Sequence, residues 1–146
     1  MLFSDRDDRK GGRRNLKTKN KIMETQKIID LSYLRQLANG SDEFMQTMIS
    51  IFIAETPAAM DNMEKSWERG DWGAIKAMAH KMKPSFGFMG ISSMKDVIAE
   101  LETDAERGEF PEIIKEKIAR IKTVCTAAIV ELRGELKKYQ KSASRI

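Results

Sequence analysis

Hydrophobic residues recur at intervals of three and four along most of this chain, with polar residues between them. This spacing puts the hydrophobic side chains on one stripe of an α-helix, and it therefore predicts amphipathic helices. Four long ones are predicted, over about residues 41–69, 71–89, 92–107 and 111–139.

The residues at the expected helix ends agree with this pattern. Ser41 stands where the first long helix needs an N-cap, and the Gly70-Asp71 pair suits a tight turn into the second, which ends near Gly87 to Gly90. Ser92 or Ser93 is expected to cap the third long helix, and Gly108 closes it.

Two prolines carry further information about these helices. Pro111 suits the first turn of the last helix, where its missing N–H is not needed. Pro57 lies inside the first long helix, and it is expected to kink or divide that helix because it removes one backbone hydrogen bond.

A shorter hydrophobic pattern precedes the long helices. Leu31, Leu34 and Leu37 share one side of a short helix that Gly40 ends. Since short turns join the long helices, neighbours should run antiparallel. The predicted fold class is all-α: an antiparallel up-down-up-down four-helix bundle with a short leading helix.

Composition fits one such domain. Of the 146 residues 41% are hydrophobic and 33% charged, and only three prolines and nine glycines interrupt the sequence. The ten methionines fall mostly on the helical stripes and are interpreted as core, with a methionine-rich binding groove as the alternative. We expect a monomer, because each stripe has a neighbouring helix to cover it.

The net charge of +4 is not spread evenly. Residues 1–27 hold nine Lys/Arg and four Asp/Glu, a net of +5, which leaves a net of −1 for residues 28–146. The first segment also lacks hydrophobic periodicity, so it is predicted to be a flexible basic arm or linker ahead of the bundle. The nearly neutral bundle offers no specific surface for nucleic acid. One alternative function remains open for this segment, that the arm binds DNA through its charge alone.

The chain has a single cysteine, Cys125, and a single histidine, His80. These are too few soft ligands for a zinc site, and one histidine with no patterned acid partner argues against a hydrolase. No secretory signal and no membrane-spanning hydrophobic run is visible, so a cytoplasmic protein with no membrane contact is expected.

Helical geometry turns His80 away from the hydrophobic stripe of its own helix. Lys76 and Lys83 lie one turn away on the same face, and Lys81 projects more to the side. A neutral imidazole has one unprotonated ring nitrogen, which can attack a phosphoryl group, and nearby lysines can stabilise its negative oxygens. No carboxylate set for a metal accompanies His80, so the chain is expected to be a substrate and not an enzyme.

The sequence His80-Lys81-Met82-Lys83-Pro84-Ser85, followed by Gly90, closely resembles the signature of histidine-containing phosphotransfer (HPt) domains of multistep two-component phosphorelays. The resemblance covers about residues 28–139. It includes the following landmarks: Ile29 to Leu34, Phe52 to Pro57, Gly70 to Trp72, Ala77 to Ala79, Glu100 to Glu102, Ala105 and Gly108.

This resemblance implies that His80 accepts a phosphoryl group from a receiver-domain aspartate and passes it to another receiver domain. The partners would be receiver domains of response regulators or hybrid sensor kinases, which supply the Mg²⁺, so no tightly bound cofactor is expected here.

The resemblance also implies roles for the neighbours of His80. By position, Lys83 would neutralise the phosphoryl group and Lys81 would assist, with Ser85 in local support and Gly87 leaving clearance. Pro84 replaces the more usual glycine. A proline has little bulk, so the face next to His80 stays accessible, but it lacks the N–H that would donate to the His80 carbonyl. The second alternative is a non-phosphorylated helical adaptor that docks receiver domains without using His80.

Overall fold

The computed structural model describes the backbone of residues 27–144 and the side chains of residues 27–140. Within this range the chain forms five α-helices and one 3-10 turn, and no strand. The elements are α2 (Ser32–Ala38), α3 (Asp42–Glu68), α4 (Trp72–Met89), η1 (Ser92–Met94), α5 (Lys95–Arg107) and α6 (Pro111–Ser144). The expected basic arm lies outside the described residues except for Lys27, so it stays a prediction, as does the monomeric state.

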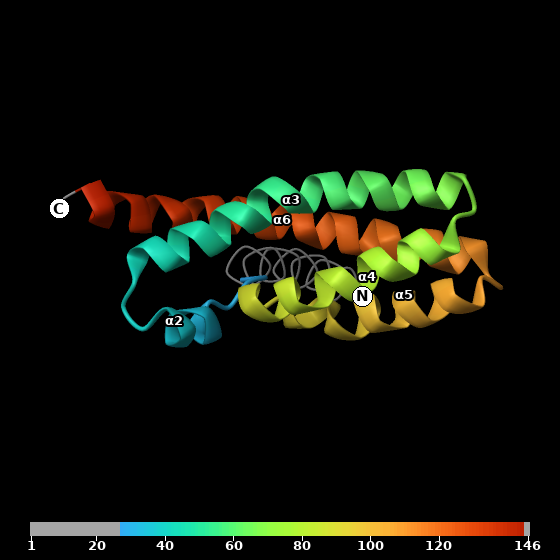
Figure 1. Cartoon of the computed structure of the whole chain (residues 1–146), viewed down its shortest axis with the longest axis horizontal. Helices are drawn as coiled ribbons and strands as arrows, with labels where there is room; N and C mark the ends of the chain where they lie inside the picture. The colour runs from blue at the N-terminus through green and yellow to red at the C-terminus, as the bar shows by residue number, and fades with distance from the viewer. Residues whose placement is uncertain (1–26, 145–146) are drawn as a thin grey trace, which may run out of the picture.

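The four long helices run antiparallel to their chain neighbours and form a bundle, as Figure 1 shows. Helix α3 packs against α4 and α6, and α5 packs against the same two helices from the other side. The short α2 covers one end of the bundle against α3 and α4. The predicted fold class is therefore confirmed.

The predicted hydrophobic stripes meet in one core. Side chains from all the helices contribute to it, and its largest fully buried members are Leu34, Met45, Ile49, Met60, Met63, Ile75, Met89, Ile91, Ile98, Leu101, Ile114 and Ile121. Burying each side chain of this size stabilises the fold by about 1.5–3 kcal/mol before the entropy of ordering is subtracted. The polar stripes of the helices are left to face solvent.

Several helix ends are built as predicted. The Ser41 hydroxyl accepts a hydrogen bond from the Phe44 N–H at 3.1 Å, and the Asp71 carboxylate accepts one from the Ala74 N–H at the same distance. Helix α3 continues through Pro57 without dividing. Figure 1 shows its axis changing direction near the middle of the helix, in line with the expected kink.

Two predicted boundaries are wrong. Neither Ser92 nor Ser93 caps α5, because both belong to the 3-10 turn η1, and α5 starts after Met94 without a side-chain cap. Met94 is buried, so the turn draws its side chain into the core. Helix α6 also continues past Tyr139 to Ser144, since no glycine or proline stands there to end it.

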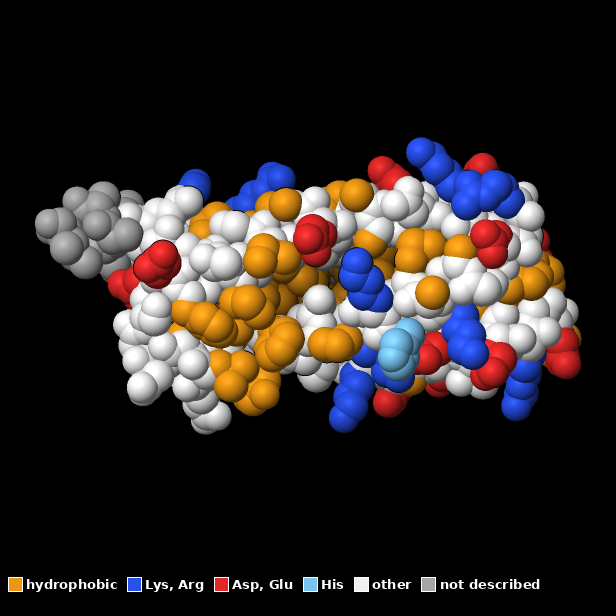
Figure 2. All heavy atoms as spheres, viewed as in Figure 1, with side chains coloured by type: hydrophobic (Ala, Val, Ile, Leu, Met, Phe, Trp, Pro, Cys, Tyr) orange, Lys and Arg blue, Asp and Glu red, His pale blue; other side chains and the backbone are white. Residues whose placement is uncertain are grey.

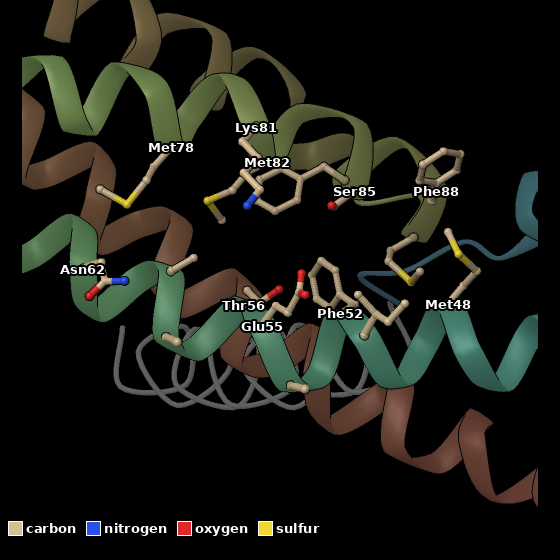
Figure 3. A pocket seen from close by; sticks show the side chains of 16 residues that line it. Met48, Phe52, Glu55, Thr56, Asn62, Met78, Lys81, Met82, Ser85 and Phe88 are labelled. Carbon is tan, nitrogen blue, oxygen red and sulfur yellow. The ribbon is translucent and has the colours of Figure 1, made fainter.

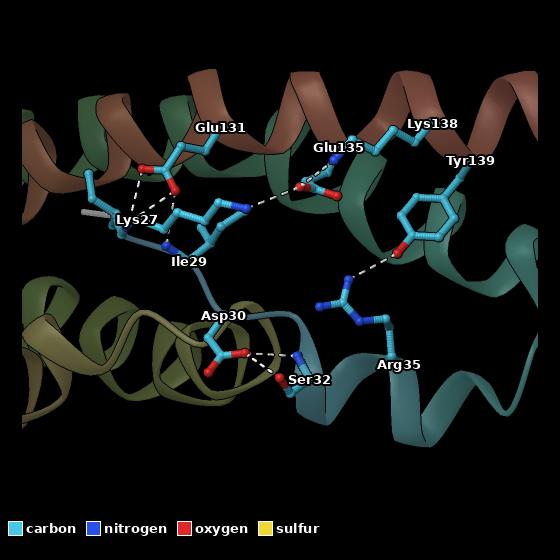
Figure 4. A network of polar contacts seen from close by, with 10 residues as sticks. Lys27, Ile29, Asp30, Ser32, Arg35, Glu131, Glu135, Lys138 and Tyr139 are labelled. Carbon is cyan, nitrogen blue, oxygen red and sulfur yellow. Dashed lines mark hydrogen bonds and ion pairs between the residues drawn. The ribbon is translucent and has the colours of Figure 1, made fainter. Parts of the chain in front are cut away.

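The chain enters the bundle between α4 and α6, as Figure 4 shows. The Glu131 carboxylate on α6 accepts hydrogen bonds from the N–H groups of Ile28 (3.0 Å) and Ile29 (3.3 Å). The Asp30 N–H donates to the Met89 carbonyl at 3.0 Å, beside the left-handed C-cap Gly90 (φ +66°). No helix among residues 27–144 is long and apolar enough to cross a membrane.

Candidate functional site

His80 lies on the outer face of α4, between core residues of the same helix. Ala79 and Met82 are buried, whereas 74% of the His80 side chain is exposed. The ring is thus accessible from solvent, which is the arrangement that the helical spacing predicts. Figure 2 shows the histidine at the surface beside a hydrophobic patch.

A carboxylate from the neighbouring helix holds the ring. Glu102 on α5 lies across from His80, with 2.9 Å between Nδ1 and Oε1. A carboxylate can only accept this hydrogen bond, so we place the proton of the neutral ring on Nδ1. That leaves Nε2 with its lone pair free. The expectation that His80 has no acid partner is wrong.

The same carboxylate also binds Lys83. Its Nζ lies 2.8 Å from Glu102 Oε2, so Glu102 bridges the lysine and the imidazole with one oxygen for each. The hydrogen bond from Lys83, assisted by the one from His80, lowers the pKa of Glu102 in spite of partial burial. Glu102 is therefore a carboxylate that stays ionised while it contacts the ring.

The predicted face with Lys76, His80 and Lys83 does come together, and it meets acidic residues of α5. Lys76 lies 3.1 Å from Glu106, one turn along from the His80 contact. Neither Glu102 nor Glu106 is among the site residues predicted from the sequence. Their spacing of four on the polar side of α5 was a visible signal, but which residue of α4 each would meet depends on how the two helices pack.

Neither Lys81 nor Ser85 is a hydrogen-bond partner of the His80 ring, which contacts Glu102. Both line a groove of about 460 Å³ between α3 and α4, as Figure 3 shows. Pro84 and Gly87 are exposed on α4, and α4 runs through Pro84 without interruption. A Cβ at Gly87 would meet nothing within 4 Å, so the surface there is open.

The groove is largely hydrophobic. Its lining comprises Met48, Ile51, Phe52, Ala54, Glu55, Thr56, Ala58, Ala59, Asn62, Met78, Lys81, Met82, Ser85, Phe86, Phe88 and Met89. Met82 and Met89 belong to the core, as predicted, but Met48 and Met78 are only half-buried, so the methionine stripes serve both core and groove. Met48 and Met78 still pack against the core, so the core interpretation holds, and the alternative of a methionine-lined groove applies to the same stripes.

Exposed hydrophobic residues extend this groove toward α2. Tyr33 stacks on Phe88 with 6.1 Å between the ring centroids, and Tyr33, Leu37 and Ile51 are each about half exposed. Such a patch next to an accessible nucleophile is typical of a surface that another protein covers.

No group of three or more His, Cys, Asp and Glu side chains that could hold a metal ion occurs in the described part of the chain. Among the described residues, the Glu102 carboxylate accepts hydrogen bonds from both the His80 ring and the Lys83 ammonium group. This set offers hydrogen bonds and charge to an incoming group.

The family model for the Hpt domain matches residues 47–137, which is more than half of the chain. Among solved structures, the crystal structure of histidine-containing phosphotransfer protein B (HptB) from Pseudomonas aeruginosa PAO1 is similar in fold, with a TM-score of 0.67 and 21% sequence identity. The match covers 77% of this chain and 96% of that one. The curated proteins yield no match.

Proposed function

The chain belongs to the Hpt domain family, and from this premise we propose that it carries a phosphoryl group on Nε2 of His80. It would receive the group from the aspartate of one receiver domain and deliver it to that of another, in a two-component phosphorelay. The observation that supports this most directly is the exposed ring whose Nδ1 is 2.9 Å from a carboxylate.

In the transfer, the lone pair of Nε2 attacks phosphorus and the Nε2–P bond forms. The P–O bond of the aspartyl phosphate breaks, and its electron pair returns to the aspartate carboxylate. The ring gains positive charge as Nε2 shares its lone pair. Glu102 stabilises that charge while the proton stays on Nδ1 within the hydrogen bond. Delivery to the second aspartate is the reverse of these steps.

The neighbours of the ring have separate roles in this proposal. Lys83, within reach of the carboxylate that holds the ring, would neutralise the phosphoryl oxygens, while Pro84 and Gly87 leave the approach open. Lys76 is engaged by Glu106 and would contribute only to the general field. We expect the receiver domain to bring its aspartate together with its Mg²⁺, so that no tightly bound cofactor is required here and the chain acts as a substrate.

The groove beside His80 suits the docking of a receiver domain. Because Lys81 directly follows His80 in α4 and lines the groove, a partner seated there would be next to the reactive ring. The half-exposed Tyr33 and Ile51 would be covered in the same contact.

Incubation with phosphorylated receiver domains of the source organism tests this function. Label should reach the wild type in an acid-labile, alkali-stable form and should be absent from His80→Gln. Glu106→Gln is the matched control, because this acid lies on the same helix but contacts Lys76 and not His80. Docking of a receiver domain without any label on His80 would favour the adaptor instead.

A further inference from the structure

The groove between α3 and α4 has two charged residues in its lining, one on each wall. Glu55 comes from α3 and Lys81 from α4, and Figure 3 shows both side chains directed into the space between the helices. Both are exposed. Among the described residues neither makes a salt bridge, whereas Lys76 and Lys83 on the neighbouring face of α4 are both paired with acids of α5.

A groove between two antiparallel helices, floored by methionine and phenylalanine, fits the hydrophobic face of a third helix. A helix lying in it would present one of its edges to Lys81 and the other to Glu55. Charge complementarity then requires an acidic edge toward α4 and a basic edge toward α3.

These two contacts also distinguish the two directions in which a helix can lie in the groove. Reversing the helix end to end, with its hydrophobic face still down, exchanges its edges. Each edge would then meet a charge of its own sign, and like charges at an interface disfavour the complex.

We propose that Glu55 and Lys81 select the direction in which an amphipathic helix of the receiver domain docks, and so fix where the receiver's aspartyl phosphate lies relative to His80. This inference rests on the proposed function. It assigns Lys81 to partner selection and leaves Lys83 as the lysine at the phosphoryl group.

The test uses a receiver domain of the source organism that phosphorylates the wild type, and it compares Lys81→Glu, Glu55→Lys and the double exchange. Each single reversal should lower the second-order rate constant for transfer by about tenfold at low salt, because charges at the rim of an interface act mainly on association. The loss should shrink as salt rises.

The double exchange is the decisive variant, since it restores the net charge of the wild type. It should be at least as slow as either single variant, because both walls then repel the edges that they normally attract. Lys95→Glu, on an exposed residue outside the groove, is the control for net charge and should transfer nearly as fast as the wild type. Far-ultraviolet circular dichroism should be the same for all variants.

If the double exchange transfers as fast as the wild type, the two residues act only through net charge and the inference is overturned. Absence of label on the wild type from every receiver domain would overturn the proposed function as well. Recovery of the double exchange by a receiver variant with its own edge charges exchanged would support the inference directly.

Discussion

His80 and Glu102 are 22 residues apart in the sequence and 2.9 Å apart in space, between Nδ1 and Oε1. The contact joins α4 to α5 and fixes both the rotation of the ring and the position of its proton. The second oxygen of Glu102 accepts a hydrogen bond from Lys83. The carboxylate therefore links the imidazole of His80 and the ammonium group of Lys83 at the surface.

The first prediction concerns this contact. Glu102→Ala should slow phosphoryl transfer to His80 by about ten- to a hundredfold, since loss of a hydrogen bond to a charged group corresponds to about 1.5–3 kcal/mol. Glu102→Gln should lose less, because its amide oxygen can still accept from Nδ1. Nitrogen chemical shifts of the imidazole should show a mixture of both tautomers in the alanine variant only. A single Nδ1–H form in that variant would contradict the assigned role.

The second prediction is that the ion pair between Glu102 and Lys83 stabilises the fold less at low pH. Lys83 lowers the pKa of Glu102 from its ordinary value of 4.5, so the folded state prefers the ionised carboxylate. Its contribution to stability should be fully present above pH 4.5 and should be lost as the pH falls through the lower folded-state value. Urea unfolding of Glu102→Gln against its parent measures this, with both chains carrying His80→Gln so that no imidazole titrates. A difference between them that does not shrink in acid would refute the ion pair with Lys83.

The third prediction concerns Gly90, which closes α4 with φ +66°. An alanine Cβ there would clash with the Asp30 carbonyl oxygen and would push the entering chain off the end of α4. We expect Gly90→Ala to lower the free energy of unfolding by at least about 2 kcal/mol, from the left-handed backbone and the clash together.

Gly134→Ala is the matched control for this substitution, because a Cβ there meets nothing within 4 Å inside α6. Better helix propensity should make it more stable by up to about 1 kcal/mol. Urea denaturation compares both variants with the wild type, and equal effects at the two glycines would show that the end of α4 tolerates a side chain.

The fourth prediction concerns Cys125. Burial in the core raises the pKa of its thiol to about 12, and the side chain is 2% exposed. A thiol reagent at pH 8 should therefore react with the native protein more than about a hundredfold more slowly than with a free thiol. In urea one thiol per chain should become reactive. Rapid native labelling would mean that the core opens readily around α6.

Much of the fold could be predicted from the sequence because its determinants are local. The stripe that carries Ile49 and Phe52, the cap at Ser41 and the turn at Gly70 all act within a few residues of their own helix. The start of α5 was not predictable in the same way, because the expected serine cap is replaced by the 3-10 turn η1. Burial of Met94 decides that turn, and burial depends on the rest of the bundle.

The same distinction between local and long-range determinants applies to the site. The exposure of His80 follows from its place on the α4 helix, so the sequence sufficed for it. The contact with Glu102 depends on how α4 and α5 slide past each other, which the sequence of neither helix specifies. Lys81 directly follows His80, and the helix turns it by about 100° toward α3. There it becomes part of the groove between α3 and α4.

The two oxygens of Glu102 have a consequence for a carrier of this kind. Without a phosphoryl group on His80, the Lys83 ammonium group binds one anion, the Glu102 carboxylate. A phosphoryl group on the ring would add a second, and the two anions would compete for it at close range. The loaded form would then hold its cargo against an internal repulsion, and this suits a protein whose task is to hand the group on and not to store it.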